Sequence, residues 1–218
     1  MTLIPRDFFD RRSVQVAPDL LGCVLEHETT AGLVAVELTE VEAYAGQADP
    51  ASHAYRGKTA RNAVMFGPPG HAYVYFTYGM YFCVNLVCEG VGDASAVLLR
   101  AGRVIEGEEL ARARRTRSSA AVASRDLARG PARLCQALDI DRSLDGADVC
   151  VADSPLRVLG RPAGPGTTER SADIKICSGP RVGIAAAAEV PWRFWVGGDP
   201  SVSAYKAHVT RRRKLVTP

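Results

Sequence analysis

The sequence lacks the cysteine and histidine spacings that bind metals in small domains. Its six cysteines are scattered along 218 residues without a C-x-x-C pair, and its four histidines follow no ligand spacing. Zinc knuckles and iron–sulfur sites are therefore not supported, and we expect no metal. Scattered, unpaired cysteines are typical of a reducing compartment, where thiols stay free and pack mostly in the core.

Long apolar segments are also missing. The N-terminal stretch MTLIPRDFFDRR carries charges where a signal peptide needs an apolar run, and no apolar run approaches the roughly 20 residues of a membrane span. We therefore expect a cytoplasmic protein and no membrane partner. The length suits one domain, and the 47% of hydrophobic and 23% of charged residues are ordinary for a globular chain.

Charge of one sign is scarce in particular segments. Residues 1–60 carry five Lys/Arg against nine Asp/Glu, residues 100–135 carry nine against four, and residues 201–218 carry five basic and no acidic residues. A basic middle and end would suit a polyanion that approaches from one side. Charge runs that are simply solvated are the commoner explanation, and this alternative stays open.

Aromatic residues make up only 7% of the chain, yet four of its seven tyrosines lie between residues 73 and 81. Two runs rich in Val, Phe and Tyr flank the pair Tyr78-Gly79, which is typical of a β-hairpin that turns at the glycine. Alternation puts Tyr73 and Tyr75 on one face, and Tyr78 would stand near the tip, free to enter a partner. Tyrosines that pack with their hydroxyls at the rim of a core remain the alternative.

A second alternating stretch, LVAVELTEVEAYA at 33–45, predicts a strand. On strict alternation its face begins apolar and ends in two carboxylates and a tyrosine, in the order Val34, Val36, Leu38, Glu40, Glu42 and Tyr44. A carboxylate on a core-facing row must be paired, hydrogen-bonded or exposed in a cleft. Glu40 and Glu42 are therefore candidate site residues, unless the strand twists out and both are solvated.

The other segments give coarser signals. Leucines after Pro18 predict a helix over 17–25, and the Gly- and Pro-rich 45–71 predicts a long loop. We expect a buried strand at 95–101 that ends near Arg100, helices at 106–117 and 131–140, and short strands within 174–205.

Seven short motifs, taken in order, resemble the alkyladenine, or 3-methyladenine, DNA glycosylase family. They are EVEAY at 40–44, SH at 52–53, ARN at 60–62, YVYFTYGMYFCVN at 73–85, VLLRA at 97–101, GPARLCQAL at 130–138 and GPRVGI at 179–184. The similarity runs from about residue 5 to residue 205, and it weakens at 114–128, at 160–173 and in the last dozen residues. The tyrosine hairpin together with E-x-E-A-Y is specific to that family.

The resemblance implies a single mixed α/β (α+β) domain over residues 1–205. Its sheet would be curved and largely antiparallel, with flanking helices and a β-hairpin that projects toward DNA. Within the domain we expect a mobile basic loop at about 114–128 and a Gly/Pro-rich connection at 160–173. A basic tail, 206–218, would follow it.

The resemblance also implies an activity on double-stranded DNA that contains damaged purines. Members of the family flip the damaged nucleotide out and hydrolyse its N-glycosidic bond, leaving an abasic site. We expect a monofunctional glycosylase of base-excision repair, because no lysine stands at a matching nucleophile position. The resemblance implies no cofactor, nothing demands more than a monomer, and in a bacterium we expect the protein to lie with the nucleoid. The implied lesion is of the 3-methyladenine type, with hypoxanthine and etheno-adenine left open.

The motif positions imply roles for single residues. Glu42 resembles the family's general base, and Arg100 and the backbone carbonyl of Val182 would help to hold the attacking water. Arg100 would also keep Glu42 ionised against the cost of burial. Tyr44, His53 and Tyr75 match pocket walls, and Asn85 matches a position at the purine edge that disfavours guanine. For DNA intercalation, Tyr78 matches the residue that enters the stack, and Met80 matches one that helps to position the hairpin near the site. Arg133 matches a basic residue near the DNA backbone.

Two other classes of function fit parts of the sequence. A DNA-damage binder that has lost catalysis would keep the hairpin, although the presence of Glu42 and Arg100 argues against it. A carboxylate hydrolase of small glycosides would use the Glu40/Glu42 strand. Neighbouring carboxylates on one strand do not flank a bond as a paired acid and base would, and such an enzyme has no use for a projecting tyrosine.

Overall fold

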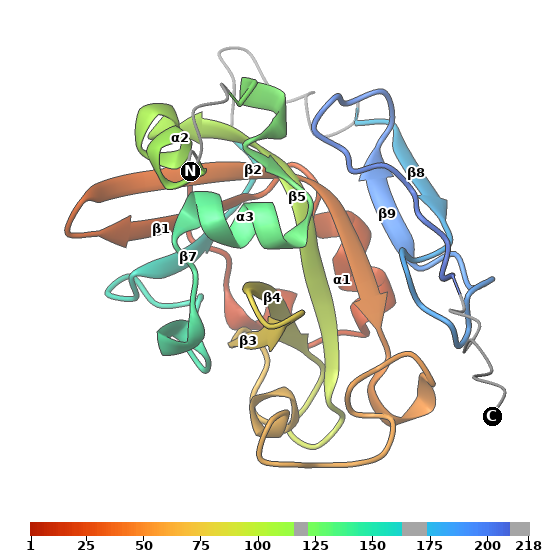
Figure 1. The fold of residues 1–218 in the computed structure, drawn as a ribbon. Coiled ribbons are helices and arrows are strands. Elements are labelled where there is room, and N and C mark those ends of the chain that lie inside the picture. The colour runs from red at the N-terminus through yellow and green to blue at the C-terminus, as the bar shows by residue number, and fades with distance from the viewer. Residues whose placement is uncertain (116–121, 163–173, 210–218) are drawn as a thin grey trace, which may run out of the picture.

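The computed structural model describes residues 1–115, 122–162 and 174–209. Over these ranges the chain forms one mixed α/β domain with three α-helices and a nine-stranded antiparallel sheet (Figure 1). This confirms the predicted fold class.

One continuous path of strands makes up most of the sheet. Its order is β3 (Ala72–Thr77), β4 (Tyr81–Cys88), β5 (Ser95–Glu106), β2 (Gly32–Tyr44), β1 (Val24–Thr29) and β7 (Leu156–Leu159). Three short strands join this path, namely β6 (Ala128–Arg129) on β5, β9 (Arg193–Val196) on β2, and β8 (Ile176–Gly179) on β9. The long strands β2 and β5 therefore form the centre, where the hairpin β3–β4 and the late strands β8 and β9 are attached.

Helices pack on this centre. In Figure 1, α3 (Pro131–Leu138) lies in front of β5, while α1 (Ser13–Leu20) lies behind β2. Both helices contribute buried apolar residues to the main core, and α2 (Glu108–Arg115) contributes Ala111. None of the helices in the described ranges is long and apolar enough to span a membrane.

The N-terminal helix is not where the sequence predicts it. The helix expected over 17–25 is wrong, because α1 ends at Leu20 and β1 starts at Val24. Gly22 lies between them with a φ of +82°, a backbone conformation that L side chains rarely adopt, and its N–H donates to the Leu38 carbonyl. The chain therefore turns into the sheet instead of adding a further helical turn.

Other predictions hold more closely. The helix expected over 131–140 is α3, which has Pro131 at its first turn, and α2 lies within the expected 106–117. The strand at 95–101 continues to residue 106, so Arg100 lies within β5 and not at its end. The loop at 45–71 contains only two short 3-10 helices.

Three expected irregular segments lie partly outside the described residues. In the basic loop at 114–128, residues 116–121 lie outside the described part of the chain. The same holds for residues 163–173 of the connection at 160–173 and for residues 210–218 of the tail at 206–218. The described part of the first segment holds the end of α2, a 3-10 helix at Ser124–Asp126 and the start of β6.

The pairing of β2 with β5 is irregular at the carboxylates. Its register shifts between Leu38 and Glu40 and again between Glu40 and Val41. Val36 and Leu38 pack in the main core before the shift, and Val41 and Ala43 pack in it afterwards. The expectation that Glu40 and Glu42 share the face of the earlier apolar residues is therefore wrong. A β-bulge turns both carboxylates away from the core, as bulges beside functional sites often do.

Gly102 makes this close pairing possible. It pairs with Leu38, and a Cβ at this position would lie 2.4 Å from the Glu37 carbonyl oxygen. Only a residue without a side chain fits there unless the backbone moves. The irregular pairing thus depends on a glycine in β5 as well as on β2.

Candidate active site

Glu42 is completely buried and has a contact on each side. Its Oε2 accepts a hydrogen bond of 2.8 Å from the Tyr44 hydroxyl, and its Oε1 accepts one of 2.7 Å from the Val182 backbone N–H. Arg100 Nη1 lies 3.3 Å from the same Oε1. The alternative that the strand carboxylates are solvated is therefore wrong. Arg100 and Val182 both contact Glu42, and Val182 does so through its backbone N–H.

Glu40 is also completely buried, and it has more donors than Glu42. Its Oε1 accepts from Arg100 Nε and Arg193 Nε, each at 2.8 Å, and from the Ser203 hydroxyl at 2.9 Å. Its Oε2 accepts from the Ser203 backbone N–H at 2.7 Å. Burial raises the pKa of Glu40, but the two guanidinium groups and the Ser203 donors outweigh burial, so that the pKa lies below its usual value. Glu40 is thus held as an anion.

A cavity of about 270 Å³ adjoins the residues that contact Glu42. Tyr44, Arg100 and Val182, which all contact Glu42, are among the residues that line it. Of the other predicted residues, His53, Tyr75, Tyr78 and Asn85 also line it. The fold therefore brings together residues from β2, the loop after it, the hairpin, β5 and the segment before β9. The lining also includes Tyr73, Arg61, Cys83 and Leu98, which had no predicted role in the pocket.

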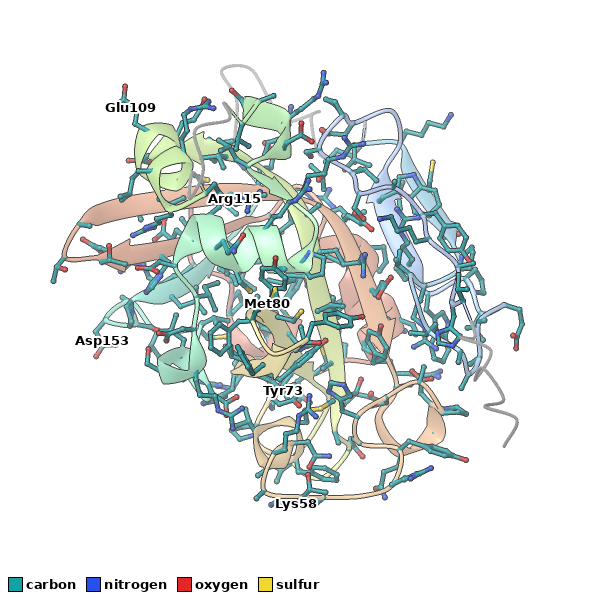
Figure 2. The ribbon with its side chains drawn as sticks, in the orientation of Figure 1. Lys58, Tyr73, Met80, Glu109, Arg115 and Asp153 are labelled. Atoms are coloured by element: carbon teal, nitrogen blue, oxygen red, sulfur yellow. The ribbon has the colours of Figure 1, made fainter. Side chains whose placement is uncertain are left out.

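Aromatic rings make one wall of this cavity. The rings of Tyr73 and Tyr75 are stacked at 5.5 Å, and the His53 ring lies edge-on to Tyr75 at 4.6 Å. His53 Nδ1 and the Tyr73 hydroxyl are 3.2 Å apart. The Arg61 guanidinium lies over the outer part of the wall, 5.7 Å from the Tyr75 ring. In Figure 2, Tyr73 is labelled at the hairpin.

The rings of the wall are held neutral. Burial, with Arg61 as a second cause, lowers the pKa of His53. Burial also raises the pKa of Tyr75, and burial together with the Glu42 carboxylate raises that of Tyr44 well above its usual value. Near neutral pH the wall therefore presents uncharged rings, whose faces attract cations and electron-poor rings.

Asn85 lies at the inner end of the hairpin. It is buried in β4, opposite Tyr73 in the register, and its Nδ2 donates to the Tyr73 carbonyl at 3.3 Å. One amide hydrogen is thereby used within the hairpin. The side chain still lines the cavity, so that it can meet a planar ligand at its edge.

The hairpin tip projects into solvent. Tyr78 is 88% exposed and Met80 is 63% exposed. Tyr78 and Gly79 have φ values of +52° and +68°, and the Met80 N–H donates to the Thr77 carbonyl at 3.2 Å, which closes the turn. The predicted turn at Tyr78-Gly79 is confirmed. The alternative of a tyrosine packed at the core rim is wrong for Tyr78, whereas Tyr73 is buried in a small cluster.

Arg133 lies apart from the two buried carboxylates. It is exposed near the start of α3 and lines a neighbouring cleft of about 350 Å³ together with Arg129, Lys206 and Arg100. Val182 lines both this cleft and the cavity. The cleft is therefore a basic continuation of the cavity mouth.

Sequence reasoning missed a second ion pair behind the pocket. Arg181 and Asp49 are fully buried, and two guanidinium nitrogens contact the two Asp49 oxygens, at 2.5 and 2.9 Å. The guanidinium carbon lies 4.6 Å from the Tyr44 ring and 5.2 Å from that of Trp192. Arg181 stands within the GPRVGI motif, where only Val182 received a role. Arg193 and Ser203 carry no periodic signal that could have found them.

No group of three or more His, Cys, Asp and Glu side chains in the described part of the chain could hold a metal ion. The described residues that line the cavity supply guanidinium groups, amides, hydroxyls, a thiol and neutral rings. The Glu42 carboxylate does not line the cavity, but it contacts three of these residues, Tyr44, Arg100 and Val182.

Comparison with known proteins defines the class. Residues 7–200 match the model of a family described as "Methylpurine-DNA glycosylase (MPG)". A protein of Streptomyces avermitilis named "Putative 3-methyladenine DNA glycosylase" is 55% identical over 216 residues, which cover 98% of this chain and 96% of the relative. Proteins with the same name are 50% identical in Leifsonia xyli subsp. xyli, covering 93% and 92%, and 48% identical in Methanocella arvoryzae, covering 93% and 96%.

These matches span nearly the whole chain and agree with the fold and the cavity. The class is that of a DNA glycosylase, a hydrolase of N-glycosyl bonds. More particularly, the chain belongs to the methylpurine-DNA glycosylase family. The predicted resemblance is confirmed, and the family match argues against the alternative of a small-glycoside hydrolase.

Proposed function

We propose that this protein flips an alkylated purine out of duplex DNA and hydrolyses its N-glycosidic bond with an activated water. The observation that carries the proposal is a buried Glu42 whose contact residues line a cavity with an aromatic wall, beside a hairpin whose Tyr78 is 88% exposed. The 3-methyladenine type of lesion is the leading substrate, and hypoxanthine and etheno-adenine are further candidates. The names of the relatives support the first of these.

The aromatic wall would bind the flipped base. Alkylation makes a purine cationic or electron-poor, and such a base stacks well on the electron-rich rings of Tyr44 and Tyr75. His53 adds a neutral ring because its pKa is lowered. Asn85 would lie at the purine edge and leave no room for the exocyclic amine of guanine. The pocket would thus favour damaged purines and disfavour a normal one.

Glu42 would act as the general base. A water held between Glu42, Arg100 and the Val182 carbonyl gives its proton to the carboxylate while its oxygen bonds to C1′. The bond between C1′ and the purine nitrogen breaks, and its electron pair leaves with the base. The carboxylate also stabilises the positive charge that develops on the sugar. No lysine is present among the described residues that line the cavity, and the proposed step therefore uses water and not an amine.

Two surfaces would hold the DNA. Tyr78 would enter the base stack and fill the space that the flipped nucleotide leaves, with Met80 beside it. Filling that space offsets part of the unstacking cost of a few kcal/mol. Arg133, with Arg129 and Lys206 in the same basic cleft, would contact phosphates next to the flipped nucleotide. Nothing in this arrangement requires more than a monomer.

The test is release of free base from methylated duplex DNA by the purified protein, with a chelator present. We expect the wild type to release 3-methyladenine and Glu42→Gln to release none. Glu37→Gln is the matched control, because Glu37 also lies in β2 but forms a surface pair with Arg103. We also expect Glu42→Gln to keep its affinity for a duplex with an abasic-site analogue. Binding of damaged duplex by both proteins without any base release would make this a recognition protein, and wild-type turnover by Glu42→Gln would refute the mechanism.

A further inference from the structure

Four charged side chains are buried together beside the cavity. Glu40 and Glu42 are completely buried, and Arg100 and Arg193 are 6% and 5% exposed. The two carboxylates and two guanidinium groups balance in charge. Since each buried ion alone would be very costly, the group must act as a unit.

The contacts within this group are unequal. Arg100 donates its Nε to Glu40 at 2.8 Å, and its Nη1 lies 3.3 Å from Glu42. Arg100 is therefore shared between the two carboxylates, with the shorter contact to Glu40. Glu40 fixes the guanidinium in such a way that a second nitrogen points toward Glu42.

Arg193 lies opposite Glu42 in the register of β2 and β9, but its side chain binds Glu40. Its Nε donates to Glu40 at 2.8 Å, and its Nη2 donates to the Ser203 carbonyl at 2.8 Å. Its guanidinium carbon lies 4.7 Å from the Trp195 ring. These partners come from β2, β9 and the segment after it, and they hold Arg193 in one orientation.

We propose that Glu40 and Arg193 are positioning residues that hold Arg100 between the carboxylates and set the electrostatic balance under which Glu42 works. Neither touches the reacting atoms in the proposed mechanism, on which this inference rests. Glu40 orients Arg100, and Arg193 supplies the cation that offsets Glu40. Without Arg193, Arg100 alone would face two anions.

Removing the charge of Arg193 and removing that of Glu40 should have opposite effects on the ionisation of Glu42. Removing the Arg193 cation leaves the group with a net negative charge, which disfavours the ionised form of Glu42. Removing the Glu40 charge leaves it net positive, which favours the ionised form. A loss of packing or folding alone would not produce opposite signs. The other titratable groups that face Glu42 are Tyr44 on β2, Tyr75 on β3 and Cys83 on β4.

Burial keeps Tyr44, Tyr75 and Cys83 from ionising in the pH range of the assay. The pKa of each of Tyr44, Tyr75 and Cys83 is raised, with burial as the largest cause. All three therefore stay neutral where the proposed reaction would be assayed. His53 also lines the cavity, and its lowered pKa lets it contribute to the acidic limb of the pH profile. Because every variant keeps His53, a difference in this limb between variants reports on the four-charge group.

The experiment is a pH–rate profile for base release by the full chain, for wild type, Glu40→Gln, Arg193→Met and Arg193→Lys. We expect the acidic limb to move up by about one pH unit in Arg193→Met and down by about one unit in Glu40→Gln. Arg193→Lys keeps the cation, so its acidic limb should lie close to that of the wild type. Glu37→Gln and Arg103→Met are the matched controls, because this pair joins β2 and β5 at the surface, and neither should move the limb.

A binding measurement keeps the inference testable if a variant is inactive. Duplexes with a cationic pyrrolidine and a neutral tetrahydrofuran abasic-site analogue are compared at a pH well above the acidic limb. The ratio of the two affinities should rise about tenfold in Arg193→Met and fall about tenfold in Glu40→Gln. If Glu40→Gln does not fold, the affinity ratios of Arg193→Met and Arg193→Lys are compared instead. The proposal then requires the ratio to rise in Arg193→Met and to stay near the wild-type value in Arg193→Lys.

The outcomes separate the two proposals. Limbs or affinity ratios that move in the same direction, or that do not move, overturn the positioning roles. Failure of the wild type to release base overturns the proposed function, while the affinity ratios still test the electrostatic balance around Glu42.

Discussion

At the scale of single residues, the two buried carboxylates differ in how fully they are satisfied. Glu40 accepts hydrogen bonds from two arginines and from both donors of Ser203. Glu42 accepts from one hydroxyl and one amide, with a longer contact to Arg100. A carboxylate with fewer donors has lone pairs left for a water. The hydrogen-bond inventory thus supports Glu42 over Glu40 as the base.

Tyr78 allows a clean test at this scale. We expect Tyr78→Ala to slow base release at least about tenfold, because the wedge that offsets part of a few kcal/mol of unstacking is lost. Tyr78→Phe should keep most of the rate. Since the side chain is 88% exposed, the free energy of unfolding should change by less than about 0.5 kcal/mol. The checks are single-turnover release and denaturant unfolding, and an unchanged rate in Tyr78→Ala would remove the hairpin from the proposal.

At the scale of elements, the pocket depends on connections between segments that are far apart in the sequence. Asp49 follows β2, and Arg181 precedes Val182 in the segment before β9. Their buried ion pair ties the backbone that carries His53 to the one that donates to Glu42. The guanidinium also lies between the rings of Tyr44 and Trp192. This pair therefore supports two sides of the cavity at once.

We predict that Asp49→Asn lowers the free energy of unfolding by roughly 3–5 kcal/mol, because it leaves the Arg181 cation buried without an anion. The double variant Asp49→Asn with Arg181→Met should recover part of this loss, since no uncompensated charge remains. Denaturant unfolding of the wild type, both single variants and the double variant gives the coupling. Additive losses would show that the two side chains do not stabilise each other.

The same elements show what could be read from the sequence. Alternation identified β2 and the hairpin, and Pro131 marked the start of α3, because these signals are local. Alternation also placed Glu40 and Glu42 on the core face, since a bulge leaves no mark in a period of two residues. The partners of Glu40 depend on long-range pairing of β2 with β5 and β9. The local sequence pattern cannot reveal such long-range contacts, and it therefore predicted no role for Arg193 or Arg181.

At the scale of the whole molecule, basic segments that are far apart in the sequence lie close together in the fold. The basic residues of 100–135 and the C-terminal region meet where Arg129, Arg133 and Lys206 line one cleft beside the cavity. The basic segments were compatible with a polyanion or with mere solvation. Because they converge beside the cavity, binding of a polyanion is a better explanation of these segments than solvation alone. Membership of a DNA glycosylase family identifies that polyanion as DNA.

This convergence predicts how binding responds to salt. Each cation that neutralises a phosphate contributes roughly 0.9 to the slope of log affinity against log salt concentration. Arg133→Ala should therefore reduce the slope by about one and weaken binding to damaged and undamaged duplex alike. Arg157→Ala is the matched control, because Arg157 pairs with Glu26 and Glu28 and lines neither the cavity nor the cleft. Affinities measured at several salt concentrations test this, and equal slopes for wild type and Arg133→Ala would place the DNA backbone elsewhere.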